Sequence, residues 1–215
     1  MTMAPAQRTA HLELPRSADV HHPAHVLLRR LRPAGAAILR RRWDLTTRGA
    51  EHVPAHGPVV IAANHVGLMD GPLMAVVGPR PVHVLAKHEM YHGTLGALLQ
   101  ASGQIPVERH GPDPEAVKTA LRVLRDGGAV GVFPEGTRGA GEVRRVKPGA
   151  AYLAMATGAT VVPLVFLGTR LPGGSTNSVP PVGSRFVLTF GAPIPVAHTP
   201  WPRRQPDTHA LSDRI

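Results

Sequence analysis

His65 and Asp70 are the residues of this chain whose types and spacing could perform acid–base chemistry, within Asn-His-Val-Gly-Leu-Met-Asp at 64–70. On one continuous helix, a separation of five would place the two side chains about 140° apart, so they could not meet. A strand, loop and helix in succession would allow contact, and the strand-like Val-Val-Ile-Ala-Ala at 59–63 and the helix-starting Asp-Gly-Pro at 70–72 favour that succession. The carboxylate could then hold one imidazole nitrogen and leave the other as a general base.

A nucleophile is missing beside this pair. The chain has no Cys, and no Ser stands in a Gly-x-Ser-x-Gly turn. A His–Asp dyad without its own nucleophile indicates direct transfer to a hydroxyl of the substrate. A short match of this kind is often accidental, and most of the 13 His lie in polar or Pro-rich stretches where a surface role is the simpler interpretation.

The elements that would position the pair follow an α/β pattern. We expect strands near 58–63, 82–87, 104–108, 129–133, 160–167 and 185–190. A helix is predicted from Asp113 to Asp126, capped by Asp113 and ended by Gly127, and an Ala-rich buried helix from Pro148 to Thr157. This alternation predicts a single layered α/β domain, with a mostly parallel or mixed sheet flanked by helices and with sites on loops at strand ends.

Three segments are predicted along the chain. Residues 1–23 mix Pro, His and charge without periodicity and are interpreted as a mobile tail, residues 24–43 as a basic amphipathic helical segment, and residues 44–215 as the catalytic domain. In the helical segment the apolar residues share one arc and most Arg lie outside it, and Pro33 is expected to kink or split the helix. Two interpretations stay open: an interfacial helix on anionic lipid, or a helix packed on the domain with a solvated Arg face.

Composition limits the class of partner. The formal charge is +10, which favours an anionic partner, but aromatic residues make up 4% of the chain and do not interleave with the Arg-rich segment. Nucleic acid is therefore disfavoured. No apolar run is long enough for a spanning helix and no secretory signal is recognisable, so we expect a cytoplasmic protein bound peripherally to the inner face of the membrane.

Two further segments place charge after predicted strands. Arg109 follows Gly-Gln-Ile-Pro-Val-Glu at 103–108, and its planar guanidinium suits a phosphate, although a surface ion pair with Glu108 or another acid would explain it alone. Glu135 and Arg138 project from Phe-Pro-Glu-Gly-Thr-Arg at 133–138. Charged residues directly after an apolar strand lie where α/β domains keep ligand sites.

Together these blocks resemble the glycerophospholipid acyltransferase family, whose best-known members are the lysophosphatidic acid acyltransferases. The resemblance runs from about residue 43 to 195 and rests on four segments in the family order: Asn-His-x-x-x-x-Asp at 64–70, Gly-x-Ile-Pro-Val-x-Arg at 103–109, Phe-Pro-Glu-Gly-Thr-Arg at 133–138 and Val-Val-Pro at 161–163. Secondary features surround Lys87 and Lys147. Val66 departs from the pattern, since many members carry a small hydroxyl residue there.

The resemblance implies a chemistry. A fatty acyl group would pass from acyl-coenzyme A or acyl carrier protein to a hydroxyl of a lysophospholipid, foremost 1-acylglycerol 3-phosphate, with His65 as general base and Asp70 orienting it. The acceptor phosphate is assigned to Arg109, with Lys87, Glu135, Gly136, Thr137 and Arg138 shaping the same pocket. Supporting positions are Asn64, Gly103, Pro106, Phe133, Pro134 and Pro163.

Alternatives remain at this stage. The acceptor could be another lyso-lipid or a glycolipid, or the protein could be a non-catalytic lipid-surface binder whose basic helix is the functional part. No cofactor is expected beyond the thioester co-substrate. No metal is expected either, because the four-residue spacing of His88 and His92 comes without an arranged acidic ligand.

Overall fold

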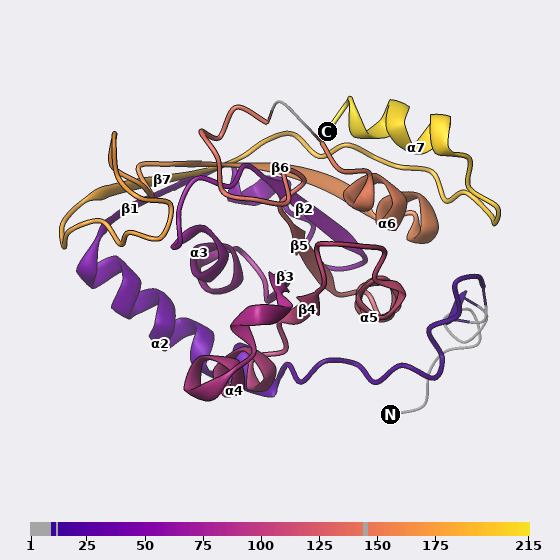
Figure 1. Ribbon diagram of the computed structural model, residues 1–215, viewed down its shortest axis with the longest axis horizontal. Helices are drawn as coiled ribbons and strands as arrows, with labels where there is room; N and C mark the ends of the chain where they lie inside the picture. Colours follow the sequence, from indigo (N-terminus) through magenta and orange to yellow (C-terminus); the bar gives the residue numbers. More distant parts are fainter. Residues whose placement is uncertain (1–9, 12, 144–145) are drawn as a thin grey trace.

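The computed structural model describes residues 10–11, 13–143 and 146–215 and contains a seven-stranded sheet in the order β1-β7-β6-β2-β5-β3-β4 (Figure 1). Neighbouring strands are parallel throughout, except for the antiparallel pair β6 and β7. The strands are β1 (Asp44–Arg48), β2 (Val59–Ala63), β3 (Val82–Lys87), β4 (Ile105–Val107), β5 (Ala129–Val132), β6 (Thr160–Leu167) and β7 (Arg185–Phe190). This confirms the predicted α/β domain with a mixed sheet.

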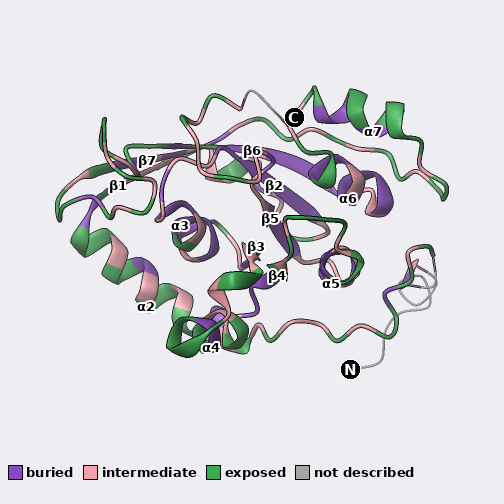
Figure 2. Cartoon of the chain, viewed as in Figure 1, coloured by how far each residue is buried: buried purple, intermediate pink, exposed green. Residues whose placement is uncertain are grey.

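Helices cover both faces of the sheet (Figures 1 and 2). They are α2 (Val26–Arg42), α3 (Asp70–Val77), α4 (Gly93–Ala101), α5 (Pro114–Arg125), α6 (Gly149–Thr157) and α7 (Gln205–Ser212), with short 3-10 turns η1 (Ala50–His52) and η2 (His88–Met90). The side chains of α2 and α3 share one core cluster with the sheet, whereas those of α5, α6 and α7 share the other. Figure 2 shows buried residues along the central strands and exposed ones on the outer sides of α2, α4 and α7.

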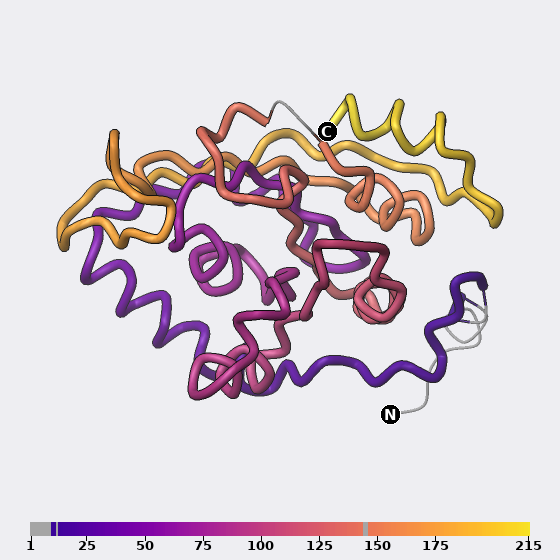
Figure 3. Tube along the Cα trace, in the orientation of Figure 1, coloured from indigo at the N-terminus to yellow at the C-terminus, as the bar shows by residue number. Residues whose placement is uncertain are grey.

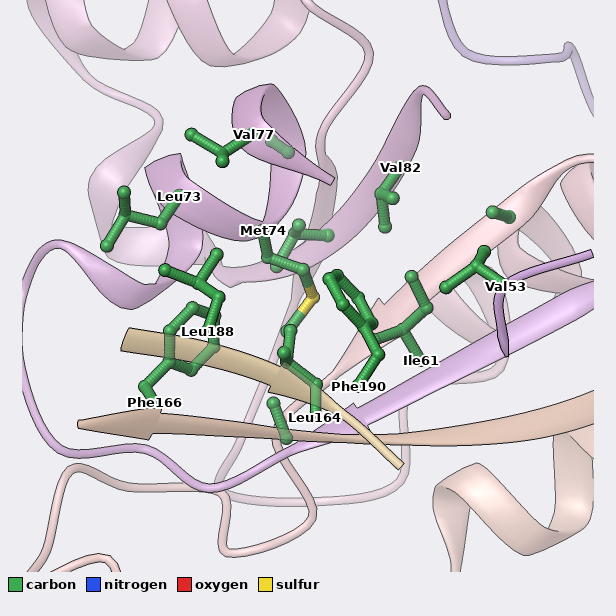
Figure 4. Packing of buried hydrophobic residues seen from close by; sticks show 14 of the residues in the cluster. Val53, Ile61, Leu73, Met74, Val77, Val82, Leu164, Phe166, Leu188 and Phe190 are labelled. Atoms are coloured by element: carbon green, nitrogen blue, oxygen red, sulfur yellow. The ribbon is translucent and has the colours of Figure 1, made fainter. Parts of the chain in front are cut away.

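Strand β2 separates the two cores because alternate side chains of a strand point to opposite faces. Val59, Ile61 and Ala63 belong to the core under α3, and Val60 and Ala62 belong to the core under α5 and α6. All five residues are buried, as expected for a central parallel strand. Figure 4 shows the first core, in which side chains of α3 pack against those of the β6 and β7 strands.

The predicted helix at 113–126 is confirmed together with its cap. The Asp113 carboxylate accepts a hydrogen bond from the N–H of Ala116 at 2.9 Å, and Pro114 occupies the first turn. The six predicted strands are also present, each within about two residues of its expected ends. Strand β1 was not predicted: Asp-Leu-Thr-Thr-Arg is short and polar, and it forms by pairing with β7 at the edge of the sheet.

Helix α2 lies within the predicted segment 24–43 and runs through Pro33 without a break, so the helix is not split there. Leu28 and Ala36 are buried against the domain, which agrees with the packing interpretation. However, Leu31 and Ile38 are exposed although both were assigned to the apolar arc. Part of the apolar face therefore packs on the domain and part faces outward.

The segment that precedes α2 crosses the molecule from the side of α5 toward α4 (Figure 3). His11 and Ser17 are buried, and the His11 ring lies 3.0 Å from both the Ser17 hydroxyl and the Asp126 carboxylate. The described part of residues 1–23 is thus held on the domain, unlike the mobile tail that was predicted. Local sequence gives no sign of this attachment, because the partners lie more than a hundred residues away; residues 1–9 and 12 lie outside the described part.

Candidate active site

The His65–Asp70 pair meets at the carboxyl end of β2, as the strand–loop–helix interpretation requires. His65 Nδ1 lies 2.9 Å from Asp70 Oδ2, and the same oxygen accepts hydrogen bonds from the N–H groups of Val66 at 2.7 Å and Gly67 at 2.8 Å. The Asp70 side chain is fully buried, whereas that of His65 is 14% exposed. With Nδ1 donating to the carboxylate, Nε2 is left as the basic nitrogen.

The chain around His65 is tied to β6 through Asn64 and to the loop after β5 through the His65 backbone. The Asn64 side chain accepts from the N–H of Phe166 at 2.7 Å and donates to its carbonyl at 3.1 Å, so it ties the end of β2 to β6. The Glu135 carboxylate accepts the N–H of His65 at 2.8 Å, and the N–H of Gly139 donates to the His65 carbonyl at 2.9 Å. Glu135 was assigned to the phosphate pocket, but the contact it makes here is with the backbone of the histidine.

The imidazole plane is set by Phe133, the first residue after β5. The two rings are stacked with centroids 3.9 Å apart and planes inclined by 14°. Phe133 packs in turn against the core that contains Phe166, whose ring centroid lies 6.4 Å away. The imidazole is therefore constrained at its edge by Asp70 and on its face by Phe133.

Six Lys and Arg side chains line the cavity beside the dyad, and four of them follow strands of the sheet. Lys87 ends β3, and Arg109, Arg138 and Lys147 lie on loops. The Arg109 guanidinium donates to the Gly136 carbonyl at 3.2 Å and lies 3.7 Å from the Glu89 carboxylate. The ion pair with an acid that was considered as an alternative is therefore present, but with Glu89, whereas the Glu108 carboxylate accepts the backbone N–H of Arg109 at 2.8 Å. These four cationic side chains come from different strand ends of one sheet edge, where parallel sheets place ligand sites.

Arg138 is a partly buried member of this group. Burial lowers the pKa of its guanidinium, although the nearby Asp70 carboxylate opposes that change and Arg109 adds to it. Arg138 also donates to the Asn177 side chain at 2.7 Å, and its Nε is buried without a partner among the described residues. The Nε of Arg109 is likewise buried without a partner among the described residues, and guanidinium groups with spare donors are suited to an anion.

The cavity has a volume of about 1320 Å³, and its lining is largely apolar apart from this basic end and from Arg32 and Arg203. His65 lies on its wall, and the helices α2, α3 and α4 supply much of the apolar lining through leucine, methionine and valine side chains. A cavity with one charged end and a long apolar wall can accommodate a molecule with an anionic head and a hydrocarbon chain.

Most of the predicted site residues reach this cavity. Its wall includes His65, Lys87, Arg109, Phe133, Pro134, Gly136, Thr137 and Arg138. Asn64, Asp70 and Glu135 are outside this wall: Asp70 and Glu135 hold His65, and Asn64 ties the end of β2 to β6. Gly103, Pro106 and Pro163 do not line it: Gly103 forms the turn after α4, Pro106 is exposed on β4, and Pro163 pairs with Ala62 inside the sheet.

Lys147 was not among the predicted site residues, although its segment was noted for a basic residue. Its N–H donates to the Pro134 carbonyl at 2.8 Å, which brings its side chain over Gly136. A β-carbon at Gly136 would lie 3.0 Å from Lys147 Nζ, and Gly136 has a φ of 71° that favours glycine. The close approach of Lys147 thus depends on that glycine, a contact that spacing alone does not reveal.

Two other features bear on the predicted partners. Within residues 10–11, 13–143 and 146–215, no three His, Asp or Glu side chains gather as metal ligands would, and His88 and His92 have ring centroids 6.4 Å apart. Over the same described ranges, none of the helices is both long enough and apolar enough to cross a membrane.

Comparison with known proteins identifies the family. The family model described as "Acyltransferase" matches residues 44–167, which is more than half of the chain. The chain belongs to this acyltransferase family. A 1-acyl-sn-glycerol-3-phosphate acyltransferase of Bacillus subtilis is 34% identical over 133 residues, covering 61% of this chain and 66% of that protein. One of the same name from Borreliella burgdorferi is 32% identical over 126 residues, covering 57% and 50%.

The match to these relatives is partial, because the chain spans between half and about two-thirds of their length. The fold agrees with the crystal structure of the 1-acyl-sn-glycerophosphate acyltransferase PlsC from Thermotoga maritima, with a TM-score of 0.61 at 22% identity. That likeness covers 87% of this chain and 77% of the other and concerns the fold.

Proposed function

We propose that this acyltransferase moves a fatty acyl group from an acyl thioester to the free hydroxyl of a lysophospholipid, with 1-acylglycerol 3-phosphate as the acceptor and phosphatidic acid as the product. The observation that carries the proposal is the His65–Asp70 hydrogen bond, which leaves Nε2 basic at the wall of a cavity with a cationic end and an apolar length. The names of the relatives support the choice of acceptor.

The reaction follows from the charges of the site. His65 Nε2 takes the proton of the acceptor hydroxyl while the hydroxyl oxygen forms a bond to the thioester carbonyl carbon. The carbon–sulfur bond then breaks with its electron pair passing to sulfur, and the imidazolium returns its proton to the thiolate. The Asp70 carboxylate faces the His65 ring while that ring is protonated and positively charged. Because the thioester is already activated, the enzyme needs no nucleophile of its own.

The acceptor phosphate is assigned to the cationic end of the cavity. Arg109 and Lys147 approach Gly136 from two sides, and Arg138 lies on the same wall. A phosphate between them would form charge-assisted hydrogen bonds, whose typical net value is about 1.5–3 kcal/mol each. The acyl donor is proposed to be acyl-coenzyme A or acyl carrier protein, and no further cofactor is invoked.

Contact with an anionic membrane surface is proposed for α2 and α4. Apolar side chains are exposed on both helices, and α2 also carries exposed Arg side chains; the apolar set is Val26, Leu31, Ile38, Leu95 and Leu98. Helices with this composition bind the interface of anionic bilayers peripherally. Both helices border the apolar part of the cavity, so a lipid chain could enter from the bilayer between them.

The test is an acceptor panel with the purified protein, acyl-coenzyme A and mass detection of the acylated product. We expect turnover with 1-acylglycerol 3-phosphate, its loss in His65→Ala, and its retention in His21→Ala, which removes an exposed histidine outside the cavity. Turnover that survives His65→Ala would refute the mechanism. Acylation of a different lyso-lipid or a glycolipid would refute the acceptor, and vesicle binding without turnover on any acceptor would favour a lipid-surface binder instead.

A further inference from the structure

Phe133 makes an unusual contact with the histidine of the dyad. Aromatic pairs in proteins prefer offset or edge-to-face arrangements, whereas the Phe133 and His65 rings lie nearly parallel with centroids 3.9 Å apart. The face of a phenyl ring is the negative end of its quadrupole. It therefore attracts a cation placed over it much more strongly than it attracts a neutral ring.

This preference matters at one stage of the reaction. Under the function proposed above, on which this inference rests, His65 is neutral before transfer and cationic after it has taken the proton of the acceptor hydroxyl. It becomes neutral again when the proton passes to the thiolate. The ring face of Phe133 thus stabilises the protonated His65 ring while the carbon–oxygen bond forms and the carbon–sulfur bond breaks.

We propose that Phe133 is a positioning residue that promotes acyl transfer by stacking on His65, both fixing the imidazole plane and stabilising its protonated form. Asp70 and Phe133 divide this task, because Asp70 contacts the edge of the ring at 2.9 Å and Phe133 contacts its face. The hydrogen bond alone would leave the ring free to swing about the Nδ1–Oδ2 direction, and the stack removes that freedom.

The surroundings of Phe133 keep it in place. It follows β5 directly and precedes the buried Pro134, and it packs against the core on the side of Phe166. The stacking partner cannot withdraw without disturbing this core. A neutral His65 therefore lies against a π-face that is already positioned for the charged state, which is the arrangement expected of electrostatic preorganisation.

Fluorination of the ring at position 133 tests the proposal, because fluorine withdraws charge from the π-face while keeping the shape of the side chain. Single-turnover acyl transfer is measured with Phe133 replaced by 4-fluoro-, 3,5-difluoro- and 3,4,5-trifluorophenylalanine. We expect the rate to fall stepwise, by about tenfold for the trifluoro ring, with KM for both substrates within about twofold. Phe133→Leu should lose about tenfold or more, and Phe133→Tyr should stay within about threefold of the parent.

The matched control is Phe186, whose ring stacks on Trp43 with centroids 5.4 Å apart in the core under α2. The same fluorinated residues at position 186 should leave the transfer rate unchanged. Equal rates across the Phe133 series, or a rise in acceptor KM in place of the rate loss, would overturn the inference. His65→Ala distinguishes failure of the proposed function from failure of the Phe133 inference. If His65→Ala retains activity, the proposed function is wrong. If His65→Ala is inactive and fluorination at position 133 has no effect, only the role of Phe133 is wrong.

Discussion

Replacing Asp70 by Asn isolates the charge of the dyad from its geometry. Asp70 Oδ2 accepts from His65 Nδ1 and from the N–H groups of Val66 and Gly67. In Asp70→Asn the amide oxygen is expected to occupy that position, because a flipped amide would point its NH₂ at two backbone donors. The tautomer of His65 should therefore be preserved while the negative charge is lost.

The size of the loss follows from the separation. Unit charges about 4 Å apart interact by about 4 kcal/mol at an effective dielectric constant of about 20, and this attraction exists only while His65 is protonated. The amide dipole recovers part of it, so we expect about 3 kcal/mol less stabilisation of the transition state. This corresponds to a decrease of about 10² to 10³-fold in kcat with little change in either KM.

Thiol release from acyl-coenzyme A in the presence of the lysophospholipid measures this effect, with thermal unfolding followed in parallel. Asp126→Asn is the matched control, because Asp126 also pairs with a buried histidine, His11, at 3.0 Å, but it precedes the amino end of β5, whereas the dyad follows the carboxyl end of the parallel strand β2. The control should lower the Tm and leave kcat unchanged. If Asp70→Asn keeps kcat within about threefold of the parent, the charge of Asp70 does not act on the reaction and the dyad mechanism is wrong.

Three other predictions concern the phosphate, the pH dependence and the membrane. Arg109→Gln should raise acceptor KM by about 10- to 100-fold and leave thioester KM unchanged in steady-state assays; an unchanged acceptor KM would place the phosphate elsewhere. Burial lowers the pKa of His83 from 6.5 to about 4, although its hydrogen bond to the Gly103 carbonyl opposes this shift. Because the unfolded chain takes up this proton at a higher pH than the folded chain, the free energy of unfolding should fall by about 3 kcal/mol as the pH drops from 6.5 to 4. His83→Asn, which can still donate to that carbonyl, should flatten the fall of Tm over this range, and an equally steep fall would contradict the assignment. Replacing exposed Val26 and Ile38, which lie outside the cavity wall, by Ser should reduce flotation with anionic vesicles while thiol release from a soluble short-chain pair persists; undiminished flotation would refute contact through α2.

The fold was predictable where periodicity and local chemistry decide it. Continuous apolar runs marked β2 and β6, and the Asp113 cap with Pro114 marked α5, since these signals act over a few residues. Strand β1 escaped prediction because its five residues, four of them polar, become a strand by pairing with β7, some 140 residues away. The attachment of the N-terminal segment escaped for the same reason, since its partners lie near residue 126 and at residues 198–203.

The contacts of the site likewise divide into those that could be predicted from the sequence and those that could not. The meeting of His65 with Asp70 could be predicted because both belong to one loop, and the convergence of Arg109 with the 133–138 segment follows from their shared edge of the sheet. The hydrogen bond from the His65 N–H to Glu135 could not be predicted. A carboxylate that follows a strand can equally bind the substrate or accept a backbone hydrogen bond, and the sequence does not distinguish the two. Lys147 reaches the site through the fold of its loop over Gly136.

The five-residue spacing of the dyad has a structural cause in the start of α3. Asp70 is the first residue of that helix, and its Oδ2 accepts the N–H groups of the two residues that follow His65. The loop thus closes on one carboxylate oxygen, which brings His65 Nδ1 to the same atom. A shorter or longer loop would move either the backbone donors or the imidazole away from it. The atom that orders the strand-to-helix turn is therefore also the atom that orients the base, so the turn cannot change its length without changing the chemistry.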